Sequence, residues 1–282
     1  MMRIFTYLLF LTLTANAQNI SGVATYKTKT SVDLKMDSKQ ITPEMQQQIQ
    51  SMLKKQFEKT YTLTFNDNES IYQEEQSLDA AGAAGGFSMI MGSFTGGKRY
   101  KNIESNRYKE ETEFFGKPFL IEDELENIEW ELVNESKQIG QYVVFKAIAS
   151  QKIDSLEFTE YERKNKKEKS ESDTIVSPID ELKLPKEKKI VAWYTPQIPI
   201  KTGPDEYWGL PGLILELKSG KTTMLCSKII LNPKEPIEID VPTKGKSVSR
   251  DEYKKIMMDK VNEMQSMYRS GGGGNFEIKI GN

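Results

Sequence analysis

Residues 191–217 read VAWYTPQIPIKTGPDEYWGLPGLILEL, and this stretch decides the fold more than any other. Pro196 and Pro199 have no amide hydrogen for a strand ladder, so the chain should leave the sheet here or follow its edge. Pro211 and Gly212 suit positions i+1 and i+2 of a type II turn, whose second position needs a positive φ. The apolar run Leu213–Leu217 then predicts a strand that is covered on both faces.

The same stretch concentrates large amphipathic rings. Such side chains either pack beneath the turns as a rigid structural corner or line a groove that binds a ligand. The corner is the simpler interpretation, and the groove stays open as the functional one. Together with the apolar centre of a glycine-rich segment upstream, these rings define the candidate ligand- or partner-binding residues: Trp193, Tyr194, Tyr207, Trp208, Leu210, Pro211, Phe87 and Met89.

Outward from this stretch, strand patterns dominate the chain. Short runs rich in β-branched and aromatic residues predict strands at Ile20–Lys27, Tyr61–Phe65, Glu69–Gln73, Lys98–Ile103, Arg107–Thr112, Pro118–Ile121, Ile128–Val133, Gln141–Ala149, Leu156–Glu162, Ile190–Tyr194, Gly212–Leu217, Thr222–Leu231 and Ile237–Val241. Asn66–Asn68 and Lys218–Gly220 are typical hairpin turns. Strands at this spacing, without alternating helices, predict a mainly β (α+β) fold, in which a curved, half-barrel-like antiparallel sheet carries two helices on one face.

Two segments have helical periodicity. Thr42 would cap the first helix, with Pro43 at its first position and an apolar stripe that reaches Phe57. The second helix should begin near Ser249, with acidic residues in its first turn, and should end before Gly271–Gly274. Its apolar stripe is rich in methionine, which is also a soft ligand for monovalent copper, but the helical spacing favours packing.

The composition excludes several kinds of chemistry. The 282 residues include no histidine and one cysteine, so Ser/His/Asp and Cys/His catalysis, histidine metal sites and an internal disulfide are all excluded. Lys and Arg number 39 against 41 Asp and Glu, which gives no reason to expect a nucleic-acid partner. No cofactor is indicated. Cys226 lies in a predicted strand, and we expect it to be a buried apolar side chain rather than a reactive thiol.

The first 17 residues have the pattern of a cleaved export signal. Arg3 precedes an apolar run of about ten residues, well short of the roughly 20 that span a membrane, and Ala15-Asn16-Ala17 suits cleavage. We therefore expect an exported protein of the periplasm or cell surface that does not span the membrane. Residues 18–282 would form a single domain, with mobile insertions near 80–97 and 162–189.

Residues 209–214 spell GLPGLI, and the sequence around them resembles the GLPGLI family of exported Bacteroidetes proteins. The resemblance extends to the segment between Trp130 and Ala147. It implies export in a Gram-negative cell and a link to outer-membrane systems, including TonB-dependent receptors. It brings no catalytic residues. The charged insertion and the Met/Gly-rich segment depart from the family pattern.

Two functions of different classes follow. The first is a non-enzymatic binding or accessory module of the envelope, with an outer-membrane protein as partner or a hydrophobic small molecule or peptide as ligand. The alternative is a carboxylate-dependent hydrolase such as a glycosidase, which needs a pair of acidic side chains across a cleft. The acidic candidates for that pair are Glu110, Glu111, Glu113, Asp205 and Glu206.

Overall fold

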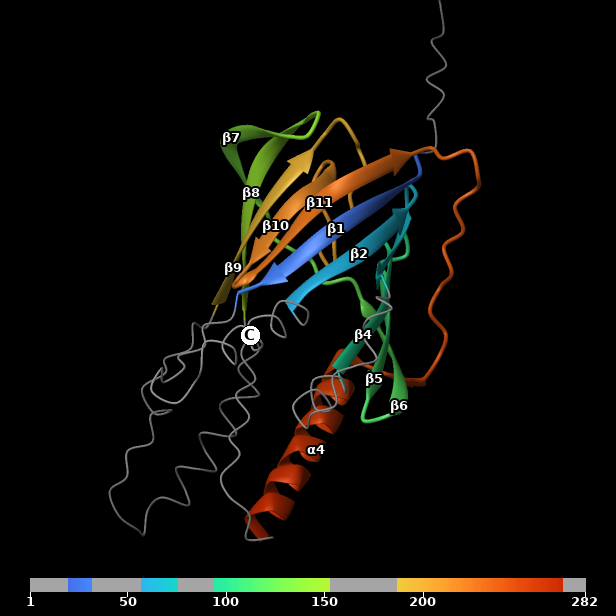
Figure 1. The fold of residues 1–282 in the computed structure, drawn as a ribbon, viewed down its shortest axis with the longest axis vertical. Coiled ribbons are helices and arrows are strands. Elements are labelled where there is room, and N and C mark those ends of the chain that lie inside the picture. Colours follow the sequence, from blue (N-terminus) through green and yellow to red (C-terminus); the bar gives the residue numbers. More distant parts are fainter. Residues whose placement is uncertain (1–19, 32–56, 76–93, 153–186, 271–282) are drawn as a thin grey trace, which may run out of the picture.

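The computed structural model describes residues 20–31, 57–75, 94–152 and 187–270 (Figure 1). In chain order the elements are β1 (Gly22–Thr30), β2 (Glu58–Phe65), β3 (Glu69–Glu74), β4 (Phe94–Asn102), β5 (Arg107–Phe114), β6 (Lys117–Glu124), β7 (Glu131–Ile139), β8 (Tyr142–Lys152), β9 (Glu187–Thr195), β10 (Leu213–Ser219), β11 (Thr222–Leu231), β12 (Lys246–Val248) and α4 (Arg250–Ser270). The predicted strands that fall in these ranges match observed strands, with one exception given below.

The strands form one sheet in the order β12-β6-β5-β4-β3-β2-β1-β11-β10-β9-β8-β7. Two meanders, β2 to β6 and β7 to β11, are joined by β1, which pairs with β2 on one side and β11 on the other. The turns of both predicted hairpins lie where expected, between β2 and β3 and between β10 and β11. In the first hairpin the Asn66 side chain accepts hydrogen bonds from the amides of Asn68 and Glu69.

The predicted architecture is wrong. The sheet is mixed rather than wholly antiparallel, because β12 pairs with β6 in parallel. Its end strands β12 and β7 do not pair, so it is an open sheet that forms no closed barrel. In the described part of the chain one helix accompanies it, rather than two packed on one face. The first predicted helix lies outside the described residues, apart from Phe57.

The parallel pair arises from the chain segment that follows β11. Residues 232–245 form no strand, although Ile237–Val241 has a strand pattern. Figure 1 shows this segment running along the outside of the molecule from the end of β11 to the region of α4. The chain therefore reaches β6 from a distance and can pair with it in parallel, whereas a tight hairpin joins only antiparallel strands.

The second predicted helix is confirmed as α4. Ser249 Oγ accepts a hydrogen bond from the Glu252 amide at 3.2 Å, and Glu252 Oε2 accepts one from the Ser249 amide at 2.9 Å. This reciprocal pair is a capping box, which satisfies two backbone donors at the helix start. Tyr253, Ile256 and Met257 pack against the buried apolar side chains of β5, β6 and β12. No helix among the described residues has the length and apolar character needed to cross a membrane.

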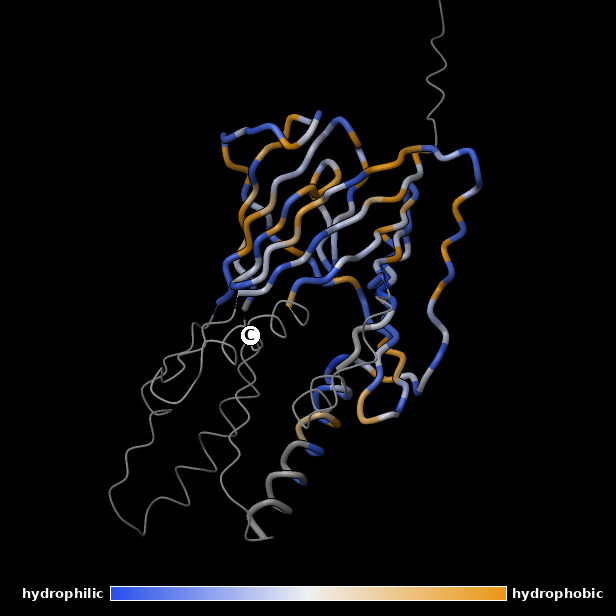
Figure 2. Tube along the Cα trace, viewed as in Figure 1, coloured by the Kyte–Doolittle hydropathy of each residue, from blue (hydrophilic) through white to orange (hydrophobic). Residues whose placement is uncertain are grey.

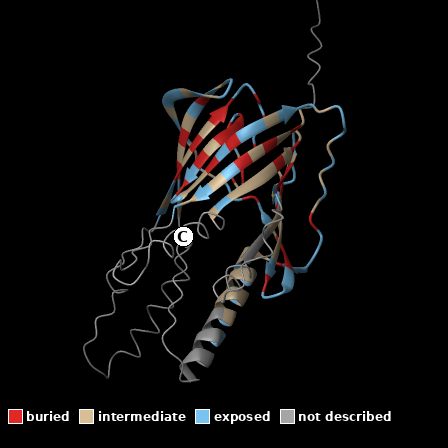
Figure 3. Ribbon diagram, viewed as in Figure 1, coloured by how far each residue is buried: buried red, intermediate tan, exposed pale blue. Residues whose placement is uncertain are grey.

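Burial alternates with exposure along the strands, as expected for a sheet with one covered face (Figures 2 and 3). Three consecutive residues are buried in β3 and in β6, and burial is most extensive in β10, where Leu213, Ile214, Leu215 and Leu217 are all buried, as their apolar pattern predicts. Part of its cover comes from residues 196–212, the connection from β9 to β10. This connection acts as a second layer against the sheet.

Candidate binding pocket

The connection 196–212, called here the β9–β10 loop, packs against the sheet through buried apolar side chains. Ile198 and Ile200 join one core cluster, and Leu210 joins another. The Leu213 amide, at the start of β10, donates to the Ile198 carbonyl at 2.9 Å. The prolines of the loop thus end the β9 ladder without leaving the chain in solvent, because the loop returns onto the sheet.

The predicted type II turn at Pro211 and Gly212 is wrong. The Gly212 amide donates to the Leu210 carbonyl at 2.8 Å, and Gly212 is not among the residues with positive φ. A Cβ on Gly212 would lie 2.2 Å from the Thr195 carbonyl oxygen, so glycine is required here for close approach of two backbones. The positive φ of this region, 95°, belongs to Gly209 instead.

A single buried lysine fixes the centre of the loop. Lys101 on β4 is 0% exposed, and its ammonium donates to three loop carbonyls. The acceptors are Gly203 and Asp205, both at 2.7 Å, and Tyr207 at 3.1 Å. Asp205 has a φ of 55°, a left-handed conformation in this tight part of the loop. Burial lowers the pKa of Lys101 to about 7, although the carboxylates of Asp205 and Glu206 favour the charged form.

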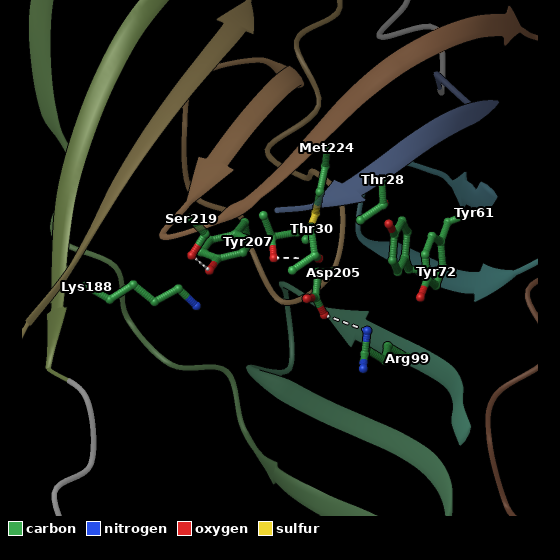
Figure 4. A pocket seen from close by; sticks show the side chains of 11 residues that line it. Thr28, Thr30, Tyr61, Tyr72, Arg99, Lys188, Asp205, Tyr207, Ser219 and Met224 are labelled. Carbon is green, nitrogen blue, oxygen red and sulfur yellow. Dashed lines mark hydrogen bonds and ion pairs between the residues drawn. The ribbon is translucent and has the colours of Figure 1, made fainter. Parts of the chain in front are cut away.

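A pocket of about 260 Å³ lies between this loop and the sheet (Figure 4). Six strands of the sheet (β1, β2, β3, β4, β10 and β11), the first residues of β9 and the loop all contribute to it. Its lining residues are Thr28, Thr30, Tyr61, Tyr72, Arg99, Lys188, Asp205, Tyr207, Ser219, Thr222 and Met224. Hydroxyl groups and charged groups dominate this lining, so the pocket suits a polar occupant.

An ion pair closes one side of the pocket. The Arg99 side chain, 23% exposed, bonds Asp205 Oδ1 at 2.9 Å and Glu110 Oε1 at 2.9 Å. Burial alone would lower the pKa of Arg99, but the charges of Asp205 and Glu110 outweigh it and raise the pKa, so the guanidinium stays charged. Figure 4 shows the Arg99–Asp205 pair as a bridge from β4 to the loop.

Two hydroxyl groups in the pocket wall are buried without a hydrogen-bond partner of ordinary geometry among the described residues: Thr28 Oγ1 and Tyr72 OH. Tyr72 is 1% exposed, and its ring stacks on Tyr61 with centroids 4.7 Å apart. Burial raises the pKa of Tyr72, and the nearby Thr28 hydroxyl opposes that rise in part. Burial also raises the pKa of Tyr61, to about 12. A buried hydroxyl without a partner is destabilising, and a bound molecule would satisfy it.

Only one of the predicted binding residues lines this pocket. Tyr207 is 1% exposed and donates to Ser219 Oγ at 2.8 Å, or accepts from it. Tyr194 and Leu210 are buried in the same core cluster as Tyr207.

The remaining predicted residues are not brought into the pocket. Trp208 Nε1 donates to the Glu126 carbonyl at 2.9 Å. The Trp193 ring lies 4.2 Å from the Lys137 ammonium, and Pro211 is exposed. Phe87 and Met89 lie outside the described residues.

The acidic candidates are mostly engaged by neighbours. Glu110 and Asp205 share Arg99, and Glu206 pairs with Arg250 at 3.2 Å. Burial, followed by the charge of Asp205, raises the pKa of Glu206.

The two other acidic candidates lie elsewhere on β5. Glu111 accepts two backbone amides, those of Thr243 and Lys244. Glu113 is exposed. Only Asp205 of the five candidates lines the pocket.

Sequence reasoning missed Arg99, Lys101 and Lys188. A signal for the first two exists, since they are alternate residues of a predicted strand and must therefore point to the same face. A basic side chain on the covered face needs acceptors there. Nothing in the charged run around Lys188 distinguishes it from its neighbours.

Fold and pocket together define a class of protein: an open, almost wholly antiparallel sheet with a small polar pocket under one loop. Residues 130–216 match the model of a family described as Porph_ging, a protein of unknown function. The matched span runs from just before β7 into β10 and contains Lys188, Asp205 and Tyr207. Among the described residues, no group of acidic or cysteine side chains is placed to hold a metal ion.

A search of curated proteins found no match. Among solved structures, the chain is similar to PNGF-II in the P21 space group, with a TM-score of 0.47 and 12% identity over 84% of this chain and 32% of that one. The same protein in the C2 space group gives 0.47 and 14% identity over 86% and 33%. The chain thus spans about a third of the length of those chains. Likeness at this level carries no argument about function.

Proposed function

We propose that the protein is a non-enzymatic binding module of the bacterial cell envelope, and that its ligand occupies the pocket under the β9–β10 loop. The observation that carries this proposal is a pocket lined largely by hydroxyl and charged groups, in which Thr28 Oγ1 and Tyr72 OH lie near each other and have no hydrogen bond of ordinary geometry among the described residues. Native structures leave few buried polar groups unsatisfied, and a polar molecule in the pocket would supply partners.

The lining favours a small polar ligand over a hydrophobic one. Met224 is an apolar contributor among threonine, serine and tyrosine hydroxyls and three charged side chains. The rings of Trp193 and Trp208, which would offer an apolar surface, do not line the pocket. An acyl chain placed here would bury these polar groups without partners, which is unfavourable.

The cellular setting of this proposal rests on the sequence. The pattern of residues 1–17 supports export, and the GLPGLI hexapeptide at residues 209–214 supports membership of that exported family. The match of residues 130–216 to an uncharacterised family includes the hexapeptide. An outer-membrane protein, of the TonB-dependent receptor kind, is the proposed partner to which the module would present its ligand.

A carboxylate-dependent hydrolase is the weaker proposal. Two carboxylates at a catalytic cleft need room for substrate between them. Asp205 is held by Arg99, and Glu206 by Arg250, so both acidic groups of the loop are neutralised by arginine. No second acidic side chain among the described residues lines the pocket with Asp205.

A pocket-filling variant tests the binding proposal. Thr222 lines the pocket, whereas its neighbour Thr223 does not. Thr222→Tyr should fill the pocket, and Thr223→Tyr is the matched control. We expect some members of a panel of small sugars, sugar acids, amino acids and hydroxy acids to raise the melting temperature of the wild type and the control, but not of Thr222→Tyr. The proposal fails if no compound of the panel binds, or if Thr222→Tyr binds as well as the wild type.

A further inference from the structure

Among the described residues, the charges around the pocket leave one cation available to a ligand. Arg99 is occupied by Asp205 and Glu110. Lys188 has no carboxylate within ion-pair distance among the described residues; its ammonium lies 6.0 Å from the centre of the Tyr207 ring. Glu206 interacts with Lys188 electrostatically, but the ion pair of Glu206 is with Arg250. In Figure 4 the Lys188 side chain extends toward Tyr207 and Asp205.

The rest of the pocket wall offers hydroxyl groups. Tyr72 OH and Thr28 Oγ1 have no hydrogen bond of ordinary geometry among the described residues, and the pairs Thr30–Thr222 and Tyr207–Ser219 join their oxygens at 2.9 and 2.8 Å. Each hydroxyl is both a donor and an acceptor with spare capacity, so this wall can exchange hydrogen bonds with the hydroxyl groups of a ligand. A carboxylate alone would satisfy only the donors.

The size of the pocket suits a single ring. A volume of about 260 Å³ corresponds to about nine water molecules at ~30 Å³ each. This is slightly below the ~300–1,000 Å³ typical of pockets for larger ligands. A single sugar ring fits a space of this size.

Resting on the proposed function, we infer that the ligand is an acidic monosaccharide, a single sugar ring with one carboxylate. The carboxylate pairs with Lys188, and the ring hydroxyls bond Tyr72, Thr28 and the paired hydroxyls between them. The Tyr61–Tyr72 stack supplies an aromatic surface beside the apolar face of the sugar ring. Asp205, held by Arg99, accepts from a ligand hydroxyl.

Calorimetric titration of the purified protein tests this inference with D-glucuronate and D-galacturonate, the neutral sugars D-glucose and D-galactose, and acetate. One of the two uronates should bind at least tenfold more tightly than its neutral counterpart, since a charge-assisted contact of this kind is worth about a factor of ten or more. Acetate, which lacks hydroxyls, should bind too weakly to measure. Raised salt should weaken uronate binding because the pair with Lys188 is partly exposed.

Two variants separate the contacts. Lys188→Met should weaken uronate binding about tenfold or more and leave the neutral sugar unchanged, whereas Lys189→Met, an exposed neighbour on the same strand, should change neither. Tyr72→Phe should weaken uronate binding several-fold, because it removes a hydroxyl of the pocket wall.

The outcomes distinguish the inference from the proposed function. Equal binding of the neutral sugar, insensitivity to Lys188→Met, or tight binding of an amino acid instead would overturn the sugar-acid inference and leave a ligand-binding pocket in place. Failure of both uronates to bind would overturn the inference alone, and failure of every compound of the wider panel to bind would overturn both.

Discussion

Replacement of Lys101 by methionine tests how the loop is held. Methionine keeps most of the length and apolar volume of the side chain but removes the ammonium that bonds the carbonyls of Gly203, Asp205 and Tyr207. Three buried acceptors would then lack donors. At ~1–3 kcal/mol for each, offset by the recovered desolvation of the charge, Lys101→Met should lower the free energy of unfolding by about 3–5 kcal/mol near neutral pH.

The pH dependence of this loss is the more specific part of the prediction. The pKa of Lys101 falls from 10.5 to about 7 on folding. Between these values the unfolded chain binds the extra proton, so the stability of the wild type should rise with pH by about 1.4 kcal/mol per unit. The rise begins near pH 7 and is absent below it. The loss caused by Lys101→Met should therefore grow with pH over this window.

Urea-induced unfolding, followed by tryptophan fluorescence from pH 6 to pH 9.5, measures the free energy of unfolding of the wild type and of Lys101→Met. Buried Cys226, whose pKa is raised to about 12, works in the opposite direction above about pH 8.5, but it is common to both and cancels in the difference. Lys98→Met, on the same strand but with its ammonium 2.6 Å from exposed Asp240, is the control and should cost about 0–1 kcal/mol. A difference between wild type and Lys101→Met that does not change with pH would refute the reasoning. If the variant does not fold, the wild type alone should still gain about 2 kcal/mol between pH 7 and 8.5.

Three further outcomes follow from the fold. Gly212→Ala should destabilise the protein by several kcal/mol or prevent folding, because the added Cβ would lie 2.2 Å from a backbone oxygen. Gly140 has open space around it, so Gly140→Ala should cost only the ~1 kcal/mol of a left-handed φ. Thermal melts compare the two variants. Ser249→Ala removes the cap of α4 and should cost ~1 kcal/mol in urea unfolding, with no loss expected if the capping box does not persist in solution. Cys226 should react with a thiol reagent only as fast as the protein unfolds, since burial raises its thiol pKa to about 12; rapid labelling of the native protein would show that it is accessible.

The local part of the fold follows from the sequence, and the long-range part does not. The Asn66–Asn68 turn and the start of α4 at Ser249 are decided by side chains that bond their own backbone within three residues. Such signals can be read from a short stretch of sequence. The parallel pairing of the three residues of β12 with β6 cannot be read in this way, because it depends on the path of residues 232–245.

The role of Gly212 shows how a correct residue can carry a wrong explanation. The sequence Pro-Gly predicts a turn with positive φ, and a tight turn is present. The requirement for glycine comes instead from the carbonyl of Thr195, a residue that is distant in sequence and approaches Gly212 only in the folded state. The GLPGLI pattern therefore records the approach of the loop to β9, which no short-range rule contains.

Two residues of the candidate pocket were named from the sequence, Tyr207 as a binding residue and Asp205 as an acidic candidate. Aromatic character drew attention to Trp193 and Trp208, yet the pocket is built of hydroxyl groups from β1, β2, β3, β10 and β11. Thr28 and Thr30 of β1 and Thr222 of the neighbouring strand β11 carry no signal in sequence, since threonines are ordinary strand formers. Their meeting around Tyr72 is a consequence of the sheet order alone.

The need for Lys101 can be argued from the loop itself. Loop residues 203, 205 and 207 turn their carbonyls toward β4, and these acceptors lie away from water. The proline at position 204 has no amide hydrogen, so the loop cannot satisfy all of them internally. An ammonium group is the compact side-chain group that offers three donors in a pyramid, and a lysine at the covered face of β4 reaches all three. The same three contacts hold Asp205 against Arg99 and Tyr207 against Ser219, so the element that covers the core also forms the wall of the pocket. Binding and stability should therefore be linked at this loop: a molecule that occupies the pocket can bind only the conformation that Lys101 maintains.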